Sequence, residues 1–300
     1  MSRNTILGGP SNSTEKTTEP GRAIDEVTER AIEAGDTETA IHRATVYGLL
    51  AVGFERPGED FEAALAEGAF SDALVESALA LDPAVAERAE AVGEYLADRE
   101  TLHKQWASLF GVEEGITVSP YELTYLPGPL MTNVRKLADI GGFYEAFGLS
   151  ISSGKNDRKD HLCLLLEFLS ILCEREAALR EAGDDRGVAV VVGAQRTFVE
   201  DHIGRWYWRF TGEVSAHDDG FYAALTDLLA ATVERDVETL DLEPNWVPDH
   251  PEVTEWNEDV FGDYGRDCGG CGVGGGFDQE AEMDLPYAPE DGPPSQPTRD

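Results

Sequence analysis

The feature that most constrains the fold is an apolar segment near the middle of the chain, DRKDHLCLLLEFLSILCER, at residues 157–175. Between Leu162 and Leu172, only Glu167 and Ser170 interrupt the run of hydrophobic residues. A helix of this composition has no face left for water, because its apolar positions surround it. The sequence therefore predicts that this segment is the central helix of a helical core.

A charged group stands at the entrance of this helix. Asp157 is predicted to cap the N-terminus, and Asp160 and His161 are predicted to lie in the first turn, where anions are favoured and backbone N–H groups are free. A polar pair at the mouth of a buried helix is a suitable place to receive a ligand. Helix capping and solvation would account for the same residues equally well. The sequence alone does not distinguish this interpretation from a ligand-binding role.

Apolar residues recur at helical spacing along most of the remaining chain. The predicted helices span residues 22–34, 39–54, 61–81 as one or two short helices, 82–110, 130–147, 188–210 and 219–240. Val188 to Val192 would suit a strand by propensity, but a lone strand has no partner, so the segment is interpreted as the start of a helix. Roughly ten helical segments without a credible sheet predict an all-α, single-domain helical bundle over about residues 21–242.

Four segments fall outside this pattern. Residues 112–129 hold three prolines and two tyrosines and cannot form a regular helix, so an ordered loop is expected there. The small polar residues 150–156 are a candidate hinge between two helical halves. Residues 1–20, and the acidic Gly/Pro-rich residues 243–300, have the composition of disordered tails.

The charge excludes several classes of partner. Acidic residues outnumber basic residues 59 to 23, which gives a formal net charge of −36. Such an excess repels phosphate backbones and anionic lipid, so neither nucleic acid nor a membrane surface is an expected partner. Concentrated salt would screen this charge, so a salt-adapted cytoplasm is the simplest explanation. The N-terminus lacks the apolar core of a signal peptide and no run is long enough to span a bilayer, so a cytoplasmic protein is expected.

Two of the four cysteines lie in the tail, where Cys268 and Cys271 form a CxxC pair in a glycine-rich setting. A zinc site needs about four ligands, and only His250 is a nearby additional candidate. The preferred interpretation is a disordered tail, with a metal site or a redox dithiol as alternatives. No cofactor is predicted.

Enzyme signatures are absent from the sequence. It contains no GxxxxGK[ST] loop for a nucleotide phosphate. A di-iron helical bundle needs two Glu-x-x-His pairs, and Glu100 with His103 is one. No nucleophile is followed by a spaced base and acid. The expectation is a protein that binds a partner and does not catalyse a reaction.

Several stretches, taken in order, resemble the TorD/DmsD/NarJ family of chaperones dedicated to molybdoenzymes of the dimethyl sulfoxide reductase type. They are RATVYGLLAVGFERP in the early helix, LFG at 109–111 followed by SPYELTY at 119–125, DIGGFYEAFGL at 139–149, KDHLCLLLEFLSIL at 159–172, FVEDHIGRWYWRF at 198–210 and FYAAL at 221–225. The resemblance extends over about residues 39–240. The acidic C-terminal extension and its CGGC sequence depart from the family pattern.

The resemblance implies an all-helical, non-catalytic chaperone. Its expected partner is the apo catalytic subunit of a molybdopterin-dependent oxidoreductase, bound through a twin-arginine-type N-terminal segment until the cofactor is inserted. Alternatives are a nitrate reductase delta-type assembly factor for a subunit that is not exported, or an accessory subunit retained in the mature complex. A monomer or a dimer that swaps halves across the linker is expected.

The family's peptide-binding determinants correspond to two short stretches of this sequence. They are Ser119, Pro120, Tyr121 and Glu122 in the loop, and Asp160 and His161 at the helix mouth. A twin-arginine peptide needs carboxylates beside an apolar groove, so Asp160 and Glu122 are expected to supply the acids. Tyr121, Tyr125, Trp106 and Phe110 are expected to supply the apolar surface, with ordinary core packing as the alternative. His161 is expected to be neutral in the complex.

Four further residues are predicted to belong to the structural core. They are Glu167, Phe168, His202 and Trp206. His202 is expected to be a hydrogen-bonded core residue and not a ligand.

Overall fold

The computed structural model describes residues 7–8, 26–95, 99–111, 117–126, 130–151 and 158–245. Its helices are α1 (Glu26–Ala34), α2 (Thr37–Phe54), α3 (Glu59–Ala66), α4 (Ala69–Leu81), α5 (Pro83–Glu94), α6 (Arg99–Phe110), α7 (Glu122–Tyr125), α8 (Leu130–Ala146), α9 (Leu162–Ala182), α10 (Asp185–Asp201), the 3-10 helix η1 (Ile203–Arg205), α11 (Tyr207–His217) and α12 (Phe221–Thr239). The predicted all-α class is confirmed, and the described residues belong to one compact unit.

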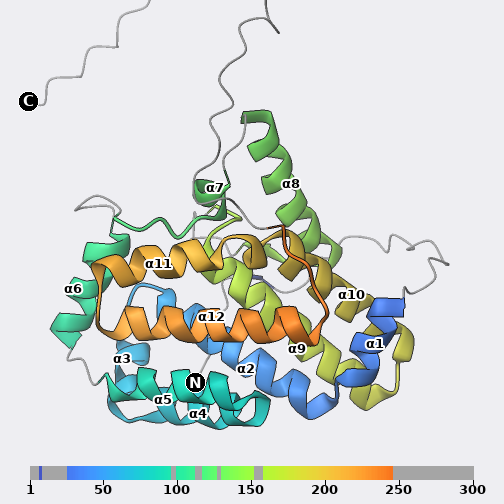
Figure 1. Cartoon of the computed structure of the whole chain (residues 1–300), viewed down its shortest axis with the longest axis horizontal. Coiled ribbons are helices and arrows are strands. Elements are labelled where there is room, and N and C mark those ends of the chain that lie inside the picture. Colours follow the sequence, from blue (N-terminus) through green and yellow to red (C-terminus); the bar gives the residue numbers. More distant parts are fainter. Residues whose placement is uncertain are drawn as a thin grey trace, which may run out of the picture. The chain divides into compact units, whose positions relative to one another are not determined.

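The predicted central helix is α9, and it lies against α2 along the core (Figure 1). Every residue from Leu162 to Leu166 is buried, as are Phe168, Leu169 and Leu172 further along. The Ser170 hydroxyl donates to the Ala44 carbonyl of α2 at 2.7 Å. A helix that is apolar on all sides must be covered on all sides, and this requirement places α9 inside the bundle.

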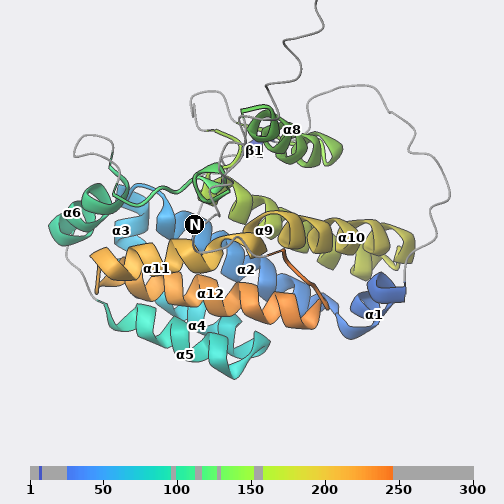
Figure 2. The same ribbon diagram turned by 45° about the horizontal axis from the view of Figure 1, so that its top comes forward.

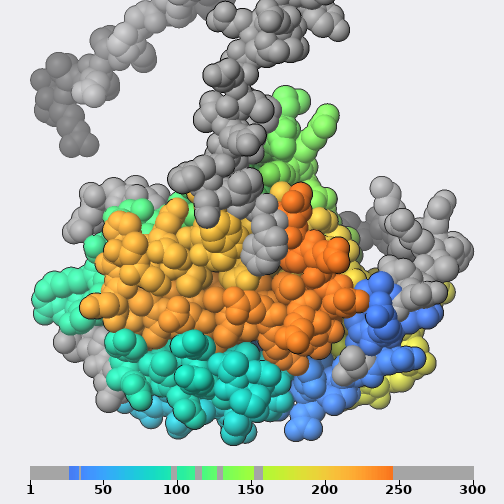
Figure 3. All heavy atoms as spheres, in the orientation of Figure 1, coloured from blue at the N-terminus to red at the C-terminus, as the bar shows by residue number. Residues whose placement is uncertain are grey.

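The other helices cover this pair. α12 packs on α5 and α11, α4 packs on α2 and α5, and α10 packs on α9 with α1 beside it. In the space-filling view, α12 fills the face between α11 and α5 (Figure 3). Within the described residues, no helix combines the length and the apolar character needed to cross a bilayer.

The start of α9 differs from the prediction. The helix begins at Leu162, and its N-cap is His161, whose Nδ1 accepts from the Cys163 N–H at 3.2 Å. Asp160 and His161 therefore lie before the helix and not in its first turn, and Asp157 lies outside the described residues. Residues 159–160 form a turn, closed by the His161 N–H donating to the Arg158 carbonyl at 3.1 Å, and His161 is extended where it pairs with Tyr121.

The predicted single helix over residues 82–110 is also wrong. Asp82 caps α5 as expected, accepting from the Ala84 N–H at 2.7 Å, but α5 ends at Glu94 and α6 begins at Arg99. Gly93 in the last turn of α5 weakens the helix, and Tyr95 at the C-cap has left the helical conformation, with φ −82° and ψ 81°. The break lets α6 bury Leu102 and Leu109.

Two short strands were not expected. β1 (Leu7–Gly8) pairs antiparallel with β2 (Ser150–Ile151), so two residues of the predicted tail pair with the first two of the predicted hinge. Strands of two residues leave no periodic signal in the sequence. The rest of the hinge, residues 152–157, lies outside the described residues, as does the C-terminal tail.

Helix α8 stands off the layers formed by the other helices (Figures 1 and 2). Ile140 and Tyr144 are buried, whereas Val134, which lies at helical spacing from them, is not. Met131 and Val134 are 67% and 52% exposed. The helical period of α8 was predicted correctly. In the N-terminal half of α8, however, the apolar side chains of Met131 and Val134 are not packed into the core.

Candidate functional site

The loop around Tyr121 and the mouth of α9 are joined through their backbones. The Leu162 N–H donates to the Pro120 carbonyl at 2.8 Å, and the Glu122 N–H donates to the Asp160 carbonyl at 3.0 Å. Between these bonds, Tyr121 and His161 form an isolated antiparallel bridge. The structure therefore brings together the two stretches, about 40 residues apart in sequence, that the prediction placed at one site.

Ser119 and Tyr125 hold the loop in shape. The Ser119 hydroxyl hydrogen-bonds the Thr124 hydroxyl at 2.7 Å. The Tyr125 hydroxyl lies 2.8 Å from the Ser119 carbonyl and 3.0 Å from the Glu213 carboxylate. Burial, reinforced by Glu213, raises the pKa of Tyr125 well above its ordinary value. These contacts support the single turn of helix α7, which the prediction of a wholly irregular segment did not include.

Asp160 is fully buried, and its carboxylate is already paired. Arg158 donates to it through Nε at 3.0 Å and through Nη2 at 2.6 Å, and the Leu123 N–H donates to Oδ2 at 3.1 Å. The Arg158 guanidinium also lies 4.7 Å from the centre of the Tyr121 ring. The expected open carboxylate is thus occupied by an arginine of the same chain.

Tyr121 and His161 form the partly exposed part of the site. Both side chains are half-buried, and their rings meet edge to face with centroids 5.1 Å apart. Pro120, beside Tyr121, is buried. Of the predicted loop and mouth residues, Ser119, Tyr121 and His161 are therefore the ones with surface available to a partner.

Glu122 points into the protein. Its side chain is fully buried, and Oε1 lies 3.0 Å from Nδ1 of His202, which is 2% exposed. Nε2 of His202 lies 3.6 Å from Oδ2 of Asp139 on α8. Oε2 of Glu122 and Nε2 of His202 are buried without a hydrogen-bond partner. Glu122 is therefore not presented to a ligand, and His202 is buried as predicted but hydrogen-bonded through one ring nitrogen.

Most of the predicted aromatic surface is core. Tyr125 is 1% exposed and stacks on Trp206, with ring centroids 5.1 Å apart. Phe110 is 6% exposed and stacks on Phe210 at 6.1 Å. Trp106 is half-buried, and its Nε1 donates to the Phe54 carbonyl at 3.0 Å. The structure favours the core alternative for Tyr125 and Phe110.

The predicted core residues differ in burial. Phe168 and Trp206 are fully buried, and Phe168 packs edge to face on Phe198 at 4.7 Å. Glu167 is half-buried on α9, so its structural role remains a prediction. Cys268 and Cys271 lie outside the described residues. Within the described ranges, no group of three or more His, Cys, Asp or Glu side chains is placed to hold a metal ion.

Two features of the site were missed by sequence reasoning. Arg158 was not considered, although its position two residues before Asp160 in a charged cluster was a signal. The exposed apolar side chains Met131 and Val134 follow the loop closely in sequence, and Val134 lies at a helical spacing that indicates a buried face. The C-terminal part of α8 also contacts the segment before α9, because the Tyr144 hydroxyl donates to the Lys159 carbonyl at 2.9 Å.

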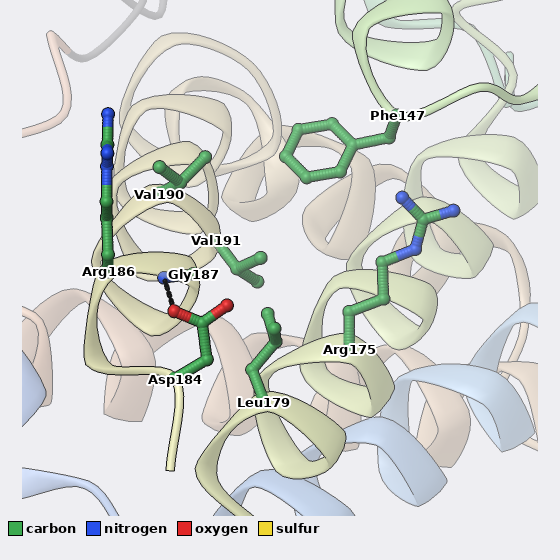
Figure 4. Close-up of a pocket in the computed structure, with 8 residues that line it drawn as sticks. All are labelled: Phe147, Arg175, Leu179, Asp184, Arg186, Gly187, Val190 and Val191. Atoms are coloured by element: carbon green, nitrogen blue, oxygen red, sulfur yellow. Dashed lines mark hydrogen bonds between the residues drawn. The ribbon is translucent and has the colours of Figure 1, made fainter. Parts of the chain in front are cut away.

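A surface hollow of about 390 Å³ lies elsewhere, between α9, α10 and the end of α8 (Figure 4). Its lining includes Arg175, whose guanidinium lies 5.4 Å from the centre of the Phe147 ring. Asp184 accepts from the Gly187 N–H at 3.0 Å and so caps α10. None of the predicted site residues lines this hollow.

Comparison with known proteins gives a consistent set of relatives. The family model described as nitrate reductase delta subunit matches residues 78–212. The perchlorate reductase assembly chaperone of Dechloromonas aromatica is 27% identical over 220 residues, which cover 69% of this chain and 94% of that protein. The selenate reductase assembly chaperone of Thauera selenatis is 33% identical over 137 residues, which cover 45% of this chain and 68% of that protein.

A TorD chaperone of Aliivibrio salmonicida is 27% identical over 122 residues, which cover 40% of this chain and 55% of that protein. The region matched by the family model includes the loop with Tyr121 and the start of α9. The relatives are named as assembly chaperones, which agrees with the expectation that this protein is not an enzyme. The chain belongs to the TorD/DmsD/NarJ family of reductase assembly chaperones.

Proposed function

We propose that this protein is a cytoplasmic chaperone for the maturation of a molybdopterin-dependent oxidoreductase. It binds the apo catalytic subunit through a twin-arginine-type N-terminal segment, assists cofactor insertion and holds the subunit back from export or assembly until insertion is complete. The observation that carries this proposal is the backbone pairing of Pro120–Glu122 with Asp160–Leu162, which sets Tyr121 and His161 beside the Asp160 carboxylate.

The chemistry of this site suits an arginine-containing peptide. A guanidinium group pairs with a carboxylate through two parallel hydrogen bonds and stacks on an aromatic ring. Asp160 and Tyr121 already hold one guanidinium group in this way, that of Arg158. The net charge of −36 favours the approach of a basic segment, although salt weakens this long-range attraction.

The apolar stretch of such a peptide needs an apolar surface nearby. Met131 and Val134 on α8 supply exposed side chains a few residues beyond the loop. These two side chains are 67% and 52% exposed, so a segment can contact them without displacing the core. In this proposal Glu122 does not touch the peptide, but positions the loop through its contact with His202.

Calorimetric titration tests the proposal. The ligand is the N-terminal peptide of a candidate catalytic subunit that carries paired arginines, compared with versions in which the paired arginines are changed to lysine or to alanine. In concentrated salt, we expect the arginine peptide to bind at least about tenfold more tightly than the alanine peptide, since a partly desolvated charged pair contributes about 1.5–3 kcal/mol.

Tyr121→Ala should weaken binding of the arginine peptide by about twofold to thirteenfold, the range given by a loss of ~0.5–1.5 kcal/mol of cation–π and stacking energy. The matched control is Tyr95→Ala, because Tyr95 is a tyrosine with 40% exposure outside this site. Equal affinities for all three peptides, or equal effects of the two tyrosine variants, would contradict the proposal.

A second candidate function follows from the match to the nitrate reductase delta subunit model. Such an assembly factor would bind an N-terminal segment without paired arginines, so the alanine peptide would bind as tightly as the arginine peptide. An accessory subunit would instead copurify with the mature reductase in a fixed ratio, whereas a chaperone is absent from it.

Sedimentation of the free protein distinguishes a monomer from a domain-swapped dimer.

A further inference from the structure

We propose that Arg158 occupies the position of a ligand's arginine, and that an incoming peptide must displace it to reach Asp160. Arg158 would then act as an internal competitor that sets the affinity and specificity of the site. This inference rests on the proposed function, because it concerns the same site. It adds a residue that the sequence comparison with the family did not single out.

The contacts of Arg158 are those expected of a bound arginine ligand. Its Nε and Nη2 reach the two different carboxylate oxygens of Asp160, at 3.0 and 2.6 Å, in a bidentate arrangement. Its guanidinium carbon lies 4.7 Å from the centre of the Tyr121 ring. Carboxylate and aromatic ring together form the recognition site for one guanidinium group. That site is filled from within the chain.

Of the two partners, Arg158 is the one able to leave. The Asp160 side chain has no exposed surface, its Oδ2 accepts from the Leu123 N–H, and the Asp160 backbone carbonyl accepts from the Glu122 N–H. The Arg158 side chain is 50% exposed. It can therefore move into solvent without opening the core, and water can solvate the released guanidinium group.

Exchange of one arginine for another leaves the number of bonds to Asp160 unchanged. A peptide arginine therefore gains less here than it would at an unpaired carboxylate, by the free energy needed to release Arg158. A lysine gains least, because its ammonium group cannot reproduce the bidentate contact. A ligand must add further contacts, such as an apolar stretch along α8, to bind well. The internal arginine also keeps the buried Asp160 carboxylate paired when no peptide is present, and so avoids the cost of an isolated buried charge.

The test is the affinity of the arginine and alanine peptides for Arg158→Gln. If Arg158 fills the site for more than about 90% of the time, its removal raises the apparent affinity for the arginine peptide about tenfold. The control is Arg88→Gln, which changes the net charge equally at an exposed arginine of α5, away from α7 (Figure 1). Neither variant should bind the alanine peptide more tightly than the wild type by more than about twofold.

Two outcomes separate this inference from the proposed function. If the wild-type protein prefers the arginine peptide but Arg158→Gln gains no more than Arg88→Gln, the inference is wrong and the proposed function stands. If neither the wild type nor Arg158→Gln prefers the arginine peptide, the proposed function itself fails. In the double variant with Asp160→Asn, the gain from removing Arg158 should disappear.

A second measurement uses the wild-type chain and does not depend on the folding of any altered site. The Arg158 Nε–H resonance in a nitrogen-15 NMR spectrum can be assigned by its loss in Arg158→Lys. Saturation with the arginine peptide should move this resonance to the position of a solvent-exposed arginine and speed its hydrogen exchange. A resonance that stays in place and remains protected at saturation would overturn the inference.

Discussion

The buried charge cluster around Arg43 allows a quantitative test of what stabilises this fold. Arg43, on α2, is 5% exposed, and Asp236, on α12, is 1% exposed. The Asp236 carboxylate accepts from Nε of Arg43 at 3.1 Å and from Nη2 at 2.6 Å. Nη1 of Arg43 donates to Gln195 at 2.6 Å and lies 3.5 Å from the Glu176 carboxylate, so one guanidinium group connects four helices. The perturbation is Arg43→Met, which keeps much of the side-chain volume and removes the charge.

The expected cost follows from the partners left behind. Removing one member of a buried ion pair costs about 3–5 kcal/mol, because the other charge stays buried. Asp236 would keep the Tyr47 hydroxyl at 2.9 Å and Arg235 at 2.8 Å. Glu176 would keep Arg180 at 2.8 Å. We therefore expect a loss near the lower end of the range, about 3 kcal/mol.

The loss should depend on pH in a defined direction. Burial alone would raise the pKa of Asp236, but the attraction and hydrogen bonds of Arg43, with help from Arg235 and Tyr47, outweigh it and hold the pKa below 3.8. The ion pair therefore stabilises the wild-type fold above pH 3.8, and this contribution is lost as the pH falls through the folded-state pKa. Without Arg43, burial should raise the pKa of Asp236, so Arg43→Met should lose less stability at mildly acidic pH than at neutral pH.

Urea unfolding in concentrated salt, followed by circular dichroism, measures these free energies. Arg88→Met is the control, since substitution at this exposed arginine should change stability by no more than about 0.5 kcal/mol. The double variant Arg43→Met with Asp236→Asn should recover part of the loss, because it no longer buries an unpaired carboxylate. A loss below about 1 kcal/mol for Arg43→Met, or a double variant less stable than the single one, would refute the reasoning.

Three further predictions concern the core. Tyr47→Phe should lower the free energy of unfolding by about 1–2 kcal/mol, because a hydrogen bond to a buried charged group is lost, and the same urea titration measures it. Gly53→Ala should destabilise by about 1–3 kcal/mol, since its Cβ would lie 2.9 Å from a Leu225 methyl, whereas Gly212→Ala on an exposed face of α11 should stabilise by up to about 1 kcal/mol. Burial raises the pKa of Cys173 to about 12, so this thiol should resist alkylation at about pH 8 until urea unfolds the chain, as peptide mass spectrometry would show.

The order and spacing of apolar residues predicted the helical class, the position of α9 and, to within about two residues, the bounds of α2, α8 and α12. These features are local, because the turn-to-turn spacing of side chains reports which face of a helix is buried. The single helix predicted over residues 188–210 is wrong, because α10 ends at Asp201 and α11 begins at Tyr207. Gly148 and Gly183 stop their helices with positive φ, at 66° and 67°, and glycine marks such ends in sequence. The pairing of the Tyr121 loop with the mouth of α9 was expected through the family resemblance and not from any local signal.

The class of fold, the family and the two stretches that meet at the site can thus be predicted from the residues alone. Which charged groups remain available at the site depends on the folded arrangement. Glu122 turns inward to His202, and Asp160 is taken by Arg158. The reason is physical: a carboxylate is exposed or buried, paired or open, according to neighbours that may lie 80 residues away, as Glu122 and His202 do, and helical periodicity carries no record of such pairs.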